Sequence, residues 1–278
     1  MKYDSSVSPV VKWVGGKRQL LPEIRKYIPK KISTYYEPFV GGGAVFLDLQ
    51  PPKAVVNDVN SELINLYQTV KDDVESLIKD LGKHKNESEY YYYVRSWDRN
   101  PRYYQGLSDV ERASRILFLN KTCYNGLFRV NQAGQFNTPF GRYKDPNIQN
   151  ANTLRAVSRY FNKSNIRFLN TDFEQAIKWC RKGSFVYFDP PYDPVSDSAN
   201  FTGYSSGGFD RKEQIRLKEL CDKLNNRGVK FLLSNASTEF INDLYTDYNI
   251  VTIKAKRAIN SNGNARGEVD EVLVRNYG

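Results

Sequence analysis

Short apolar runs and glycine clusters alternate along the first 60 residues. The runs occupy residues 10–14, 35–40 and 54–56, and the glycines are Gly15-Gly16 and Gly41-Gly42-Gly43. This alternation is typical of strand-loop-helix units, because glycine permits the tight turns that follow a buried strand. We therefore expect the chain to open with strands of an α/β sheet.

The spacing of apolar residues becomes helical after Ser61. The positions that recur at this spacing are Leu63, Ile64, Leu66, Tyr67, Val70, Val74, Leu77, Ile78 and Leu81. Residues 110–119 show the same period, which predicts another helix. The middle of the chain is therefore expected to be a helical insertion.

Strand patterns return in the second half of the chain. They occupy residues 166–169, 185–188, 229–234, 250–254 and 269–274. The sheet is therefore expected to draw on both ends of the chain. Within the middle region, residues 128–130 and 135–137 flank Asn131-Gln132-Ala133-Gly134, which favours a hairpin turn. Residues 196–208 are rich in Ser and Gly and are the clearest candidate for a mobile loop.

The charge balance of the chain favours a polyanionic partner. Its 278 residues include 41 Lys and Arg against 31 Asp and Glu, a formal charge of +10 with a pI near 9.3. Nucleic acid is the partner that this balance favours. No apolar run approaches the roughly 18 residues that span a membrane. The first 16 residues also lack the apolar core of a signal peptide, so we expect a cytoplasmic location and no membrane partner.

Cysteine and histidine are too few for the commonest metal and nucleophile sites. Cys123, Cys180 and Cys221 are odd in number and far apart, which argues against a disulfide framework or a CxxC-type zinc site. His84 is the only histidine and lies in a polar stretch, which weakens any Ser-His-Asp triad. We therefore expect reduced thiols, no metal, and chemistry that runs without histidine.

The tetrapeptide Asp189-Pro190-Pro191-Tyr192 is the strongest chemical signal. It follows the apolar run 184–188, and ligands of open α/β sheets bind beyond the carboxyl ends of strands. The exocyclic amine of a base is a poor nucleophile, because its lone pair is delocalised into the ring. The Asp189 carboxylate can accept one N–H of such an amine and the Pro190 carbonyl the other. Tyr192 offers a flat face to a base pulled out of a duplex. The alternative is a strand capped by an Asp-Pro turn with a packed tyrosine.

A glycine turn in residues 37–44 is a candidate cofactor site. It lies between an expected strand and an expected helix, where Gly41 and Gly43 would let a ligand approach the backbone. Asp58 follows Gly41 by 17 residues, in the position of an acid that binds ribose hydroxyls. A nicotinamide fingerprint requires a third glycine where this chain has Phe46, which favours S-adenosylmethionine (AdoMet) over NAD. The alternative is a tight turn beside a surface acid.

A second glycine turn lies in Lys12-Trp13-Val14-Gly15-Gly16-Lys17. It lacks the G-x-x-x-x-G-K-[ST] spacing of a P-loop, so it does not imply nucleotide hydrolysis. Taken alone, it is equally well a simple turn that carries a solvated lysine.

Two basic segments are candidates for contact with nucleic acid. Within residues 120–144, basic residues alternate with aromatic ones and no acid is present. The members are Lys121, Arg129, Arg142 and Lys144, with Tyr124, Phe128, Phe136, Phe140 and Tyr143. Cations attract phosphates, while arginine and aromatic side chains can read or separate bases, so this segment is a candidate DNA-reading hairpin. Residues 252–267 carry Lys254 and Arg266 around an Asn-rich stretch, which predicts a flexible phosphate-binding loop. For residues 120–144, a solvated charged face with buried aromatics is the alternative.

Taken together, these motifs resemble those of the Dam-type DNA adenine-N6 methyltransferases, the bacterial and phage enzymes that act on GATC. The matching segments are residues 12–17, 37–44, 57–58, 124–127, 129–131, 136–144, 189–192 and 200–202. The resemblance implies an α/β fold with an AdoMet-dependent, Rossmann-like sheet that is mixed but mainly parallel. An inserted helical target-recognition domain would carry the β-hairpin. We expect the catalytic AdoMet-binding domain in residues 1–58 and 164–278, and the DNA target-recognition domain in residues 59–163.

The same resemblance assigns roles to individual residues. The expected AdoMet ligands are Trp13, Gly15, Lys17, Glu37, Phe39, Gly41, Gly43, Asp58 and Asp172. The expected contacts to double-stranded DNA are Lys12, Tyr124, Asn125, Leu127, Arg129, Pro139 and Tyr143, and the basic loop adds Lys254 and Arg266. The 189–192 tetrapeptide would act on N6 of a flipped adenine by in-line methyl transfer. Thr122-Cys123 departs from the enterobacterial pattern, so the resemblance leaves the preference for flanking sequence open and does not affect the expected chemistry.

Other classes of protein are weighed against this resemblance. A C5-cytosine methyltransferase needs a nucleophilic cysteine in a Pro-Cys context, and none of the three cysteines has one. An N4-cytosine methyltransferase must also methylate a poorly nucleophilic exocyclic amine, although it more often carries Ser in place of Asp189. A DNA-binding protein without catalysis would keep the basic hairpin but has no reason for the Asp189 motif. The sequence leaves open whether an enzyme of this kind acts alone or pairs with a restriction endonuclease.

Overall fold

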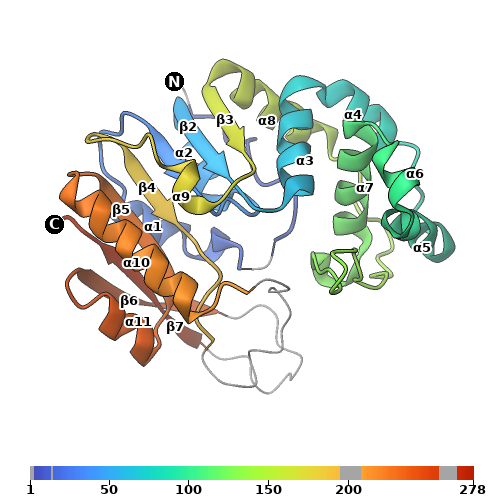
Figure 1. Cartoon of the computed structure of the whole chain (residues 1–278). Coiled ribbons are helices and arrows are strands. Elements are labelled where there is room, and N and C mark those ends of the chain that lie inside the picture. The colour runs from blue at the N-terminus through green and yellow to red at the C-terminus, as the bar shows by residue number, and fades with distance from the viewer. Residues whose placement is uncertain (1–2, 14, 195–207, 257–267) are drawn as a thin grey trace. The chain divides into compact units, whose positions relative to one another are not determined.

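The computed structural model describes residues 3–13, 15–194, 208–256 and 268–278. Within these residues the strands form a seven-stranded sheet in the order β3-β2-β1-β4-β5-β7-β6 (Figure 1). The strands are β1 (Tyr35–Glu37), β2 (Lys53–Asn57), β3 (Asn165–Leu169), β4 (Phe185–Phe188), β5 (Lys230–Ala236), β6 (Asn249–Lys256) and β7 (Glu268–Arg275). β2, β1, β4 and β5 are parallel neighbours, whereas β7 runs antiparallel to both β5 and β6. The predicted mixed, mainly parallel α/β sheet is therefore confirmed.

The chain divides into two compact units. The first unit comprises residues 1–16, 40–52 and 57–171. The second unit comprises residues 17–39, 53–56 and 172–278. Each unit therefore combines segments that are far apart in the sequence.

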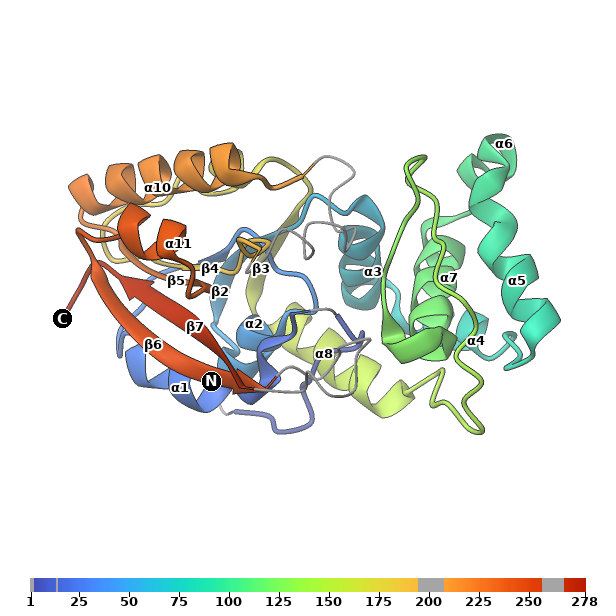
Figure 2. The same cartoon turned by 90° about the horizontal axis from the view of Figure 1, so that it is seen from below.

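The second unit places buried strands between helices. Every residue of β1 and β4 is buried, as are six of the seven residues of β5, because strands covered on both faces read as continuous apolar runs. Figure 2 shows α10 (Arg211–Asn226) and α11 (Glu239–Leu244) on one face of these strands and α1 (Leu21–Tyr27) on the other. The short η1 (Lys17–Gln19) and α9 (Phe173–Ala176) complete the unit. The carboxyl ends of β1 and β4 thus emerge from a rigid core.

The first unit is mainly helical. Its helices are α2 (Ala44–Leu49), α3 (Ser61–Asp72), α4 (Val74–Leu81), α5 (Ser88–Ser96), η2 (Trp97–Arg99), α6 (Pro101–Gln105), α7 (Asp109–Thr122), η3 (Tyr124–Gly126) and α8 (Ala151–Lys163). The central helix is α7, which packs against α3, α4 and α5 (Figure 1). It begins with a capping box, in which the Ser108 hydroxyl accepts the Glu111 N–H and the Glu111 carboxylate accepts the Ser108 N–H. In the described part of the chain, none of the helices combines the length and apolarity needed to cross a membrane.

Two expected elements differ from the prediction. The helical pattern of residues 61–81 is divided at Asp73, whose backbone leaves the helical region while its carboxylate accepts the Ser76 N–H and caps α4. The expected strand at residues 10–14 is wrong, because residues 10–13 form no strand and residue 14 lies outside the described residues. The side-chain amide of Asn120 binds both the N–H and the carbonyl of Lys12, which takes the place of pairing with another strand.

The predicted hairpin and loops have mixed outcomes. The turn at residues 131–134 is present, with one isolated bridge between Val130 and Phe136 in place of regular strands. The strand predicted at residues 250–254 is confirmed as part of β6, where Lys254 is in register with Asp270 of β7. The loop expected from residue 252 onward is therefore wrong up to residue 256. Residues 257–267, including Arg266, lie outside the described residues, as does the Ser- and Gly-rich segment up to residue 207.

Candidate active site and DNA-reading loop

Asp189 lies immediately after β4, where two side chains hold one of its carboxylate oxygens. Lys17 Nζ donates to Asp189 Oδ1 at 2.9 Å, and Ser234 Oγ donates to the same oxygen at 3.0 Å. Phe188 of β4 is in register with Leu233 of β5, which brings the next residues of the two strands together. Among the described residues, every hydrogen bond of this carboxylate involves Oδ1. Oδ2 therefore keeps its capacity to accept an N–H from a substrate.

Burial and a neighbouring cation act in opposite directions on Asp189. Burial raises the pKa of this carboxyl group, whereas the charge of Lys17 and hydrogen bonds from Lys17 and Ser234 lower it. Lys17 itself is only 5% exposed. The Asp189 carboxylate is half-buried, and a carboxylate and an ammonium in contact stabilise each other's charged forms. Lys17 is a predicted cofactor ligand, and in the structure its ammonium pairs with Asp189.

Hydrogen bonds to the surrounding elements fix the rest of the tetrapeptide. The Tyr192 hydroxyl donates to Glu271 Oε2 of β7 at 2.7 Å, and Lys17 Nζ lies 4.5 Å from the centroid of the Tyr192 ring. The Pro191 carbonyl accepts from Gln214 Nε2 of α10 at 2.9 Å. The structure therefore brings Asp189, Tyr192 and Lys17 into one polar cluster of the second unit.

The other cofactor candidates of the second unit lie at the end of β1 and at the start of α9. Glu37 is buried and accepts a hydrogen bond from the Tyr35 hydroxyl at 2.6 Å. The ring of Phe39 packs against Phe173, with their centroids 5.3 Å apart. Asp172 caps α9 through the Glu174 N–H and forms an ion pair with Arg216 of α10. Phe39 thus packs against another aromatic ring, whereas the Asp172 carboxylate binds the start of α9 and Arg216.

The cofactor candidates of the first unit surround the glycine turn. Gly41 and Gly43 have φ of 45° and 66°, the left-handed region that favours glycine. A Cβ at Gly41 would lie 2.9 Å from Cδ1 of Trp13, so a larger residue here would collide with the indole ring. Asp58 Oδ2 accepts the Gly41 N–H at 3.0 Å, and Asp58 Oδ1 accepts the Asn60 N–H at 2.9 Å. Asp58 therefore braces the turn from the end of β2.

These residues fit AdoMet in chemical type. Burial raises the pKa of Asp58, while the Asn60 and Gly41 N–H groups lower it. Each oxygen of this carboxylate accepts one backbone N–H and has a second lone pair for a ribose hydroxyl. Aromatic rings such as Phe39 suit the flat adenine of the cofactor. Among the described residues there is no group of three or more His, Cys, Asp or Glu side chains that could hold a metal ion.

The expected DNA-contact residues of the first unit gather around residues 123–143, which we call the reading loop. Asn120 of α7 is fully buried and donates to the carbonyls of Lys12 and Gly126 at 2.7 and 3.1 Å. Lys12 Nζ lies 5.0 Å from the centroid of the Tyr143 ring. The outcome for the remaining candidates is that Tyr124, Asn125, Arg129 and Pro139 are exposed and Leu127 is half-buried. One buried amide thus joins two expected DNA-contact segments.

Trp13 contacts both the glycine turn and the reading loop. Its ring lies against Gly41 and Gly42, and it stacks on Phe128 with the centroids 4.9 Å apart and an interplanar angle of 21°. Phe128 immediately precedes Arg129. Within the first unit, two packed rings therefore lie between the glycine turn and the residue that precedes Arg129.

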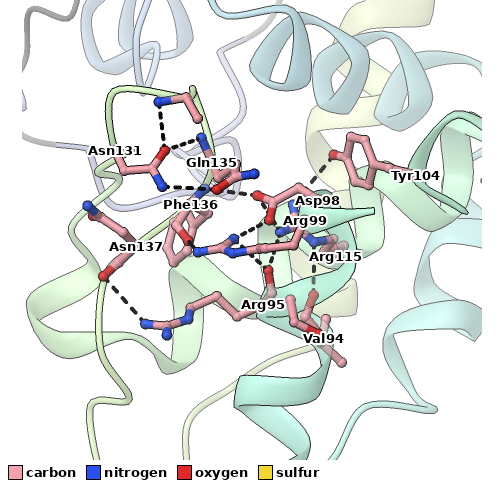
Figure 3. Close-up of polar contacts among 12 residues, drawn as sticks. Val94, Arg95, Asp98, Arg99, Tyr104, Arg115, Asn131, Gln135, Phe136 and Asn137 are labelled. Atoms are coloured by element: carbon pink, nitrogen blue, oxygen red, sulfur yellow. Dashed lines mark hydrogen bonds and ion pairs between the residues drawn. The ribbon is translucent and has the colours of Figure 1, made fainter. Parts of the chain in front are cut away.

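Side chains of α5 and η2 brace the second arm of the reading loop (Figure 3). Asp98 Oδ2 accepts the Phe136 N–H at 2.8 Å and also contacts Nη2 of Arg115, at 2.8 Å. Arg99 donates to the Phe136 carbonyl at 2.5 Å, and Arg95 donates to the Thr138 carbonyl at 3.2 Å. The arm therefore has a fixed path although it forms no regular strand.

Asn137 binds both the side chain and the backbone of Arg129. Arg129 Nε donates to Asn137 Oδ1 at 2.8 Å, and the Asn137 carbonyl in turn accepts from Arg95 at 3.4 Å (Figure 3). The Nη groups of a guanidinium provide the two parallel donors that pair with guanine. The hydrogen bond to Nε therefore orients the guanidinium and leaves its Nη donors out of this contact.

The sequence patterns do not indicate Ser234, Asn120 and Asp98 as site residues. Ser234 and Asn120 are polar residues that directly follow apolar runs of β5 and α7, and both are fully buried. Such a position is the available signal, because a buried polar group needs a partner. Which partner it finds depends on the packing of elements that are distant in the sequence.

Comparison with known proteins identifies relatives over nearly the whole chain. The family model described as D12 class N6 adenine-specific DNA methyltransferase matches residues 13–259. The Type II methyltransferase M1.LlaDCHI of Lactococcus lactis subsp. cremoris is 46% identical over 275 residues, which cover 98% of this chain and 96% of that protein. The Type II methyltransferase M.MjaIII of Methanocaldococcus jannaschii is 40% identical over 292 residues, covering 98% and 99% of the two chains. The DNA adenine methylase of Escherichia coli (strain K12) is 35% identical over 268 residues, covering 95% and 93%.

These matches decide between the classes that the sequence left open. The family acts on N6 of adenine and not on N4 of cytosine. Its members are catalysts, so a DNA-binding protein without catalysis is also set aside. The chain belongs to the D12 class of N6-adenine-specific DNA methyltransferases.

Proposed function

We propose that this adenine-N6 methyltransferase acts within GATC in double-stranded DNA, on an adenine that has rotated out of the duplex. The observation that carries the catalytic part is the Asp189 carboxylate at the end of β4, with Oδ1 held by two donors. The GATC part is supported by the motifs in residues 124–131 and 136–144, which resemble those of Dam-type enzymes. Those motifs belong to the reading loop.

Asp189 acts on the target amine through hydrogen bonding. Enzymes of this class use AdoMet, which supplies an electron-deficient methyl group. Asp189 Oδ2 accepts one N–H of the adenine amine, while the Pro190 carbonyl is the candidate acceptor for the other, since Gln214 binds the Pro191 carbonyl. Two acceptors localise the nitrogen lone pair and direct it toward the methyl group. A strong base is not required, because the nitrogen loses its proton easily once it is methylated.

Tyr192 provides the surface on which the flipped adenine stacks. Its hydroxyl is fixed by Glu271, and one face of its ring lies near the Lys17 ammonium. The other face is the candidate stacking surface, since a base taken out of the duplex needs an aromatic neighbour to replace its lost stacking. Base, carboxylate and ring would then occupy one cluster of the second unit.

AdoMet binding is assigned to the cofactor candidates that the sequence indicates. In the first unit, Asp58 would accept the ribose hydroxyls, and Trp13, Gly15, Gly41 and Gly43 would form the turn beside the cofactor. In the second unit the assigned residues are Lys17, Glu37, Phe39 and Asp172. The buried Glu37 carboxylate, the half-buried Asp58 carboxylate and the Phe39 ring support this assignment, because AdoMet combines polar hydroxyl and ammonium groups with a flat base.

DNA binding is assigned to residues 59–163 as the target-recognition domain, together with Lys12. Arg129 would read a base edge, and Tyr124, Asn125, Leu127, Pro139 and Tyr143 would contact the duplex beside it. Lys254 and Arg266 would contact phosphates. The exposure of Tyr124 and Arg129 supports their roles, because a residue that reaches into a groove must project from the protein.

Digestion with GATC endonucleases tests the specificity. DNA incubated with enzyme and AdoMet should resist an endonuclease that methylation blocks and should become sensitive to one that requires methylated GATC. Product analysis should find N6-methyladenine. Methylated product without either change in digestion would place the site in another sequence.

Because two of the relatives are named Type II methyltransferases, we also propose pairing with a restriction endonuclease of the same specificity. In that case, cells that express the enzyme should be protected from that endonuclease.

A further inference from the structure

A chain of hydroxyl groups leads from the core of the sheet to Asp189. The Tyr187 hydroxyl lies 3.0 Å from Ser234 Oγ, which lies 3.0 Å from Asp189 Oδ1. We infer that Ser234 and Tyr187 form a hydroxyl relay that orients the Asp189 carboxylate and keeps it ionised, so that both are positioning residues for methyl transfer. This inference rests on the proposed role of Asp189.

The sheet fixes the geometry of the relay. Tyr187 precedes Asp189 by two residues, so both side chains leave the chain on the same side of β4. Ser234 lies on β5, the parallel neighbour of β4, where Phe188 is in register with Leu233. Tyr187 and Ser234 are both 0% exposed. Water is therefore excluded from these two hydroxyls, and each must find its partner within the protein.

Counting protons gives the direction of the relay. An ionised carboxylate has no proton to donate, so Ser234 uses its single proton toward Asp189. The bond between Ser234 and Tyr187 must then be donated by Tyr187. The competing acceptor for Ser234 is the Phe188 carbonyl, at the longer distance of 3.4 Å. The relay is therefore complete when Asp189 is charged.

The charges around Asp189 explain why a neutral donor matters there. The burial of this carboxyl group raises its pKa, and the opposing groups are Lys17 from η1 and Ser234 from β5. The other titratable groups of the cluster are acids: Tyr187, Tyr192, Glu37 of β1 and Glu271 of β7. Lys17 is the single cation among these groups of the described chain. Loss of the Ser234 hydroxyl should therefore raise the pKa of Asp189 and move the acidic limb of the rate profile to higher pH.

The test compares Ser234→Ala, Tyr187→Phe, the double variant and Asp189→Ala in single-turnover methyl transfer from about pH 5 to pH 9. Ser234→Ala should slow transfer about 10-fold at neutral pH, because it removes one hydrogen bond to a charged group. Its acidic limb should move upward. Tyr187→Phe should have a smaller effect in the same direction. In the Ser234→Ala background it should add nothing, because the relay is already broken. Binding of AdoMet and of DNA should change less than about twofold in each variant.

Controls separate the relay from folding and from the role of Asp189. Tyr245→Phe removes another fully buried tyrosine hydroxyl from the same unit and should leave rate and pH profile unchanged. Wild-type rate and pH profile in both Ser234→Ala and Tyr187→Phe would overturn the relay. Asp189→Ala should lose activity on the order of 100-fold or more. If it does, wild-type behaviour of the two hydroxyl variants would overturn the relay and leave the role of Asp189 standing. An active Asp189→Ala enzyme would instead overturn the proposed role of Asp189, and the relay with it.

Discussion

Asp58 combines two tasks in one carboxylate. Both of its oxygens already accept backbone N–H groups that shape the glycine turn, and the proposed function adds the ribose hydroxyls of AdoMet. Asp58→Ala should weaken AdoMet binding by roughly 1.5 to 3 kcal/mol, the range for hydrogen bonds to a charged group. Asp58→Asn should lose less, because its carbonyl oxygen still accepts. Titration calorimetry measures both affinities.

The control for Asp58 is DNA affinity, which should change little in either variant. Thermal unfolding of the free protein reports separately on the loss of the turn brace. If Asp58→Ala binds AdoMet with the wild-type dissociation constant, the carboxylate does not bind the cofactor and only holds the glycine turn.

Site residues could be predicted from the sequence where a polar residue follows an expected strand. Site residues inside the sheet could not be predicted in this way. Asp189 and Asp58 each follow an apolar run, and the structure places both at strand ends with their carboxylates engaged. The partnership of Lys17 and Ser234 with Asp189 could not be predicted. The Ser234 contact depends on β4 and β5 being neighbours, although their residues are about 45 positions apart in the chain. The Lys17 contact depends on the packing of η1, which lies about 170 positions before Asp189.

The reading loop shows how side chains take the place of a strand ladder at the scale of an element. Two isolated bridges, Cys123 with Phe140 and Val130 with Phe136, join its two arms. Asp98, Arg99 and Arg95 fix the second arm from outside (Figure 3). A loop whose backbone is held in this way can present Arg129 in one orientation. This rigidity is what base reading requires, because bidentate pairing with guanine depends on the aim of the guanidinium.

Arg129→Ala should therefore reduce the specificity of the enzyme. We expect a loss of about 1 to 3 kcal/mol on the GATC site and relaxed discrimination at one base pair. The measurement is methylation of GATC and of every single-base variant at fixed salt. Lys144→Ala is a matched control, an exposed basic residue close to the same loop, and should slow all sequences alike. If Arg129→Ala instead slows methylation of all these sequences by the same factor, Arg129 contributes only electrostatic attraction to DNA.

Elements were predictable from periodicity, but their limits depended on individual side chains. The strands after residue 164 and the helix of residues 110–119 are confirmed as β3 to β7 and α7. The apolar period of residues 61–81 continues across Asp73, so it gives no sign of the break that this side chain caps. At residues 10–13 the apolar run resembled a strand, because the sequence could not show that Asn120 would bind the backbone there.

At the scale of the whole molecule, packing and function divide the chain differently. Packing groups residues 40–52 with the helices of the first unit, whereas the sequence assigns the glycine turn to cofactor binding and residues 59–163 to DNA. The functional division stays a prediction. The contact of Trp13 with both the glycine turn and Phe128 gives a physical reason for the grouping, since a packed ring ties the turn to the reading loop.

The net charge of +10 predicts a strong effect of salt on DNA binding, and Lys254 should contribute to it. Its side chain is exposed on β6, in register with Asp270, and it therefore presents its charge from a fixed strand. A lysine that contacts phosphate adds affinity for every sequence, because the backbone of DNA is uniform.

Lys254→Ala should weaken binding to GATC and to unrelated DNA alike. It should also reduce the slope of log affinity against log salt by about 0.9, the value for one phosphate contact. Lys26→Ala removes the same charge from an ion pair with Glu23 on α1 and should leave the slope unchanged. A Lys254→Ala enzyme with the wild-type slope, or with altered discrimination between sequences, would show that this strand does not anchor the DNA backbone.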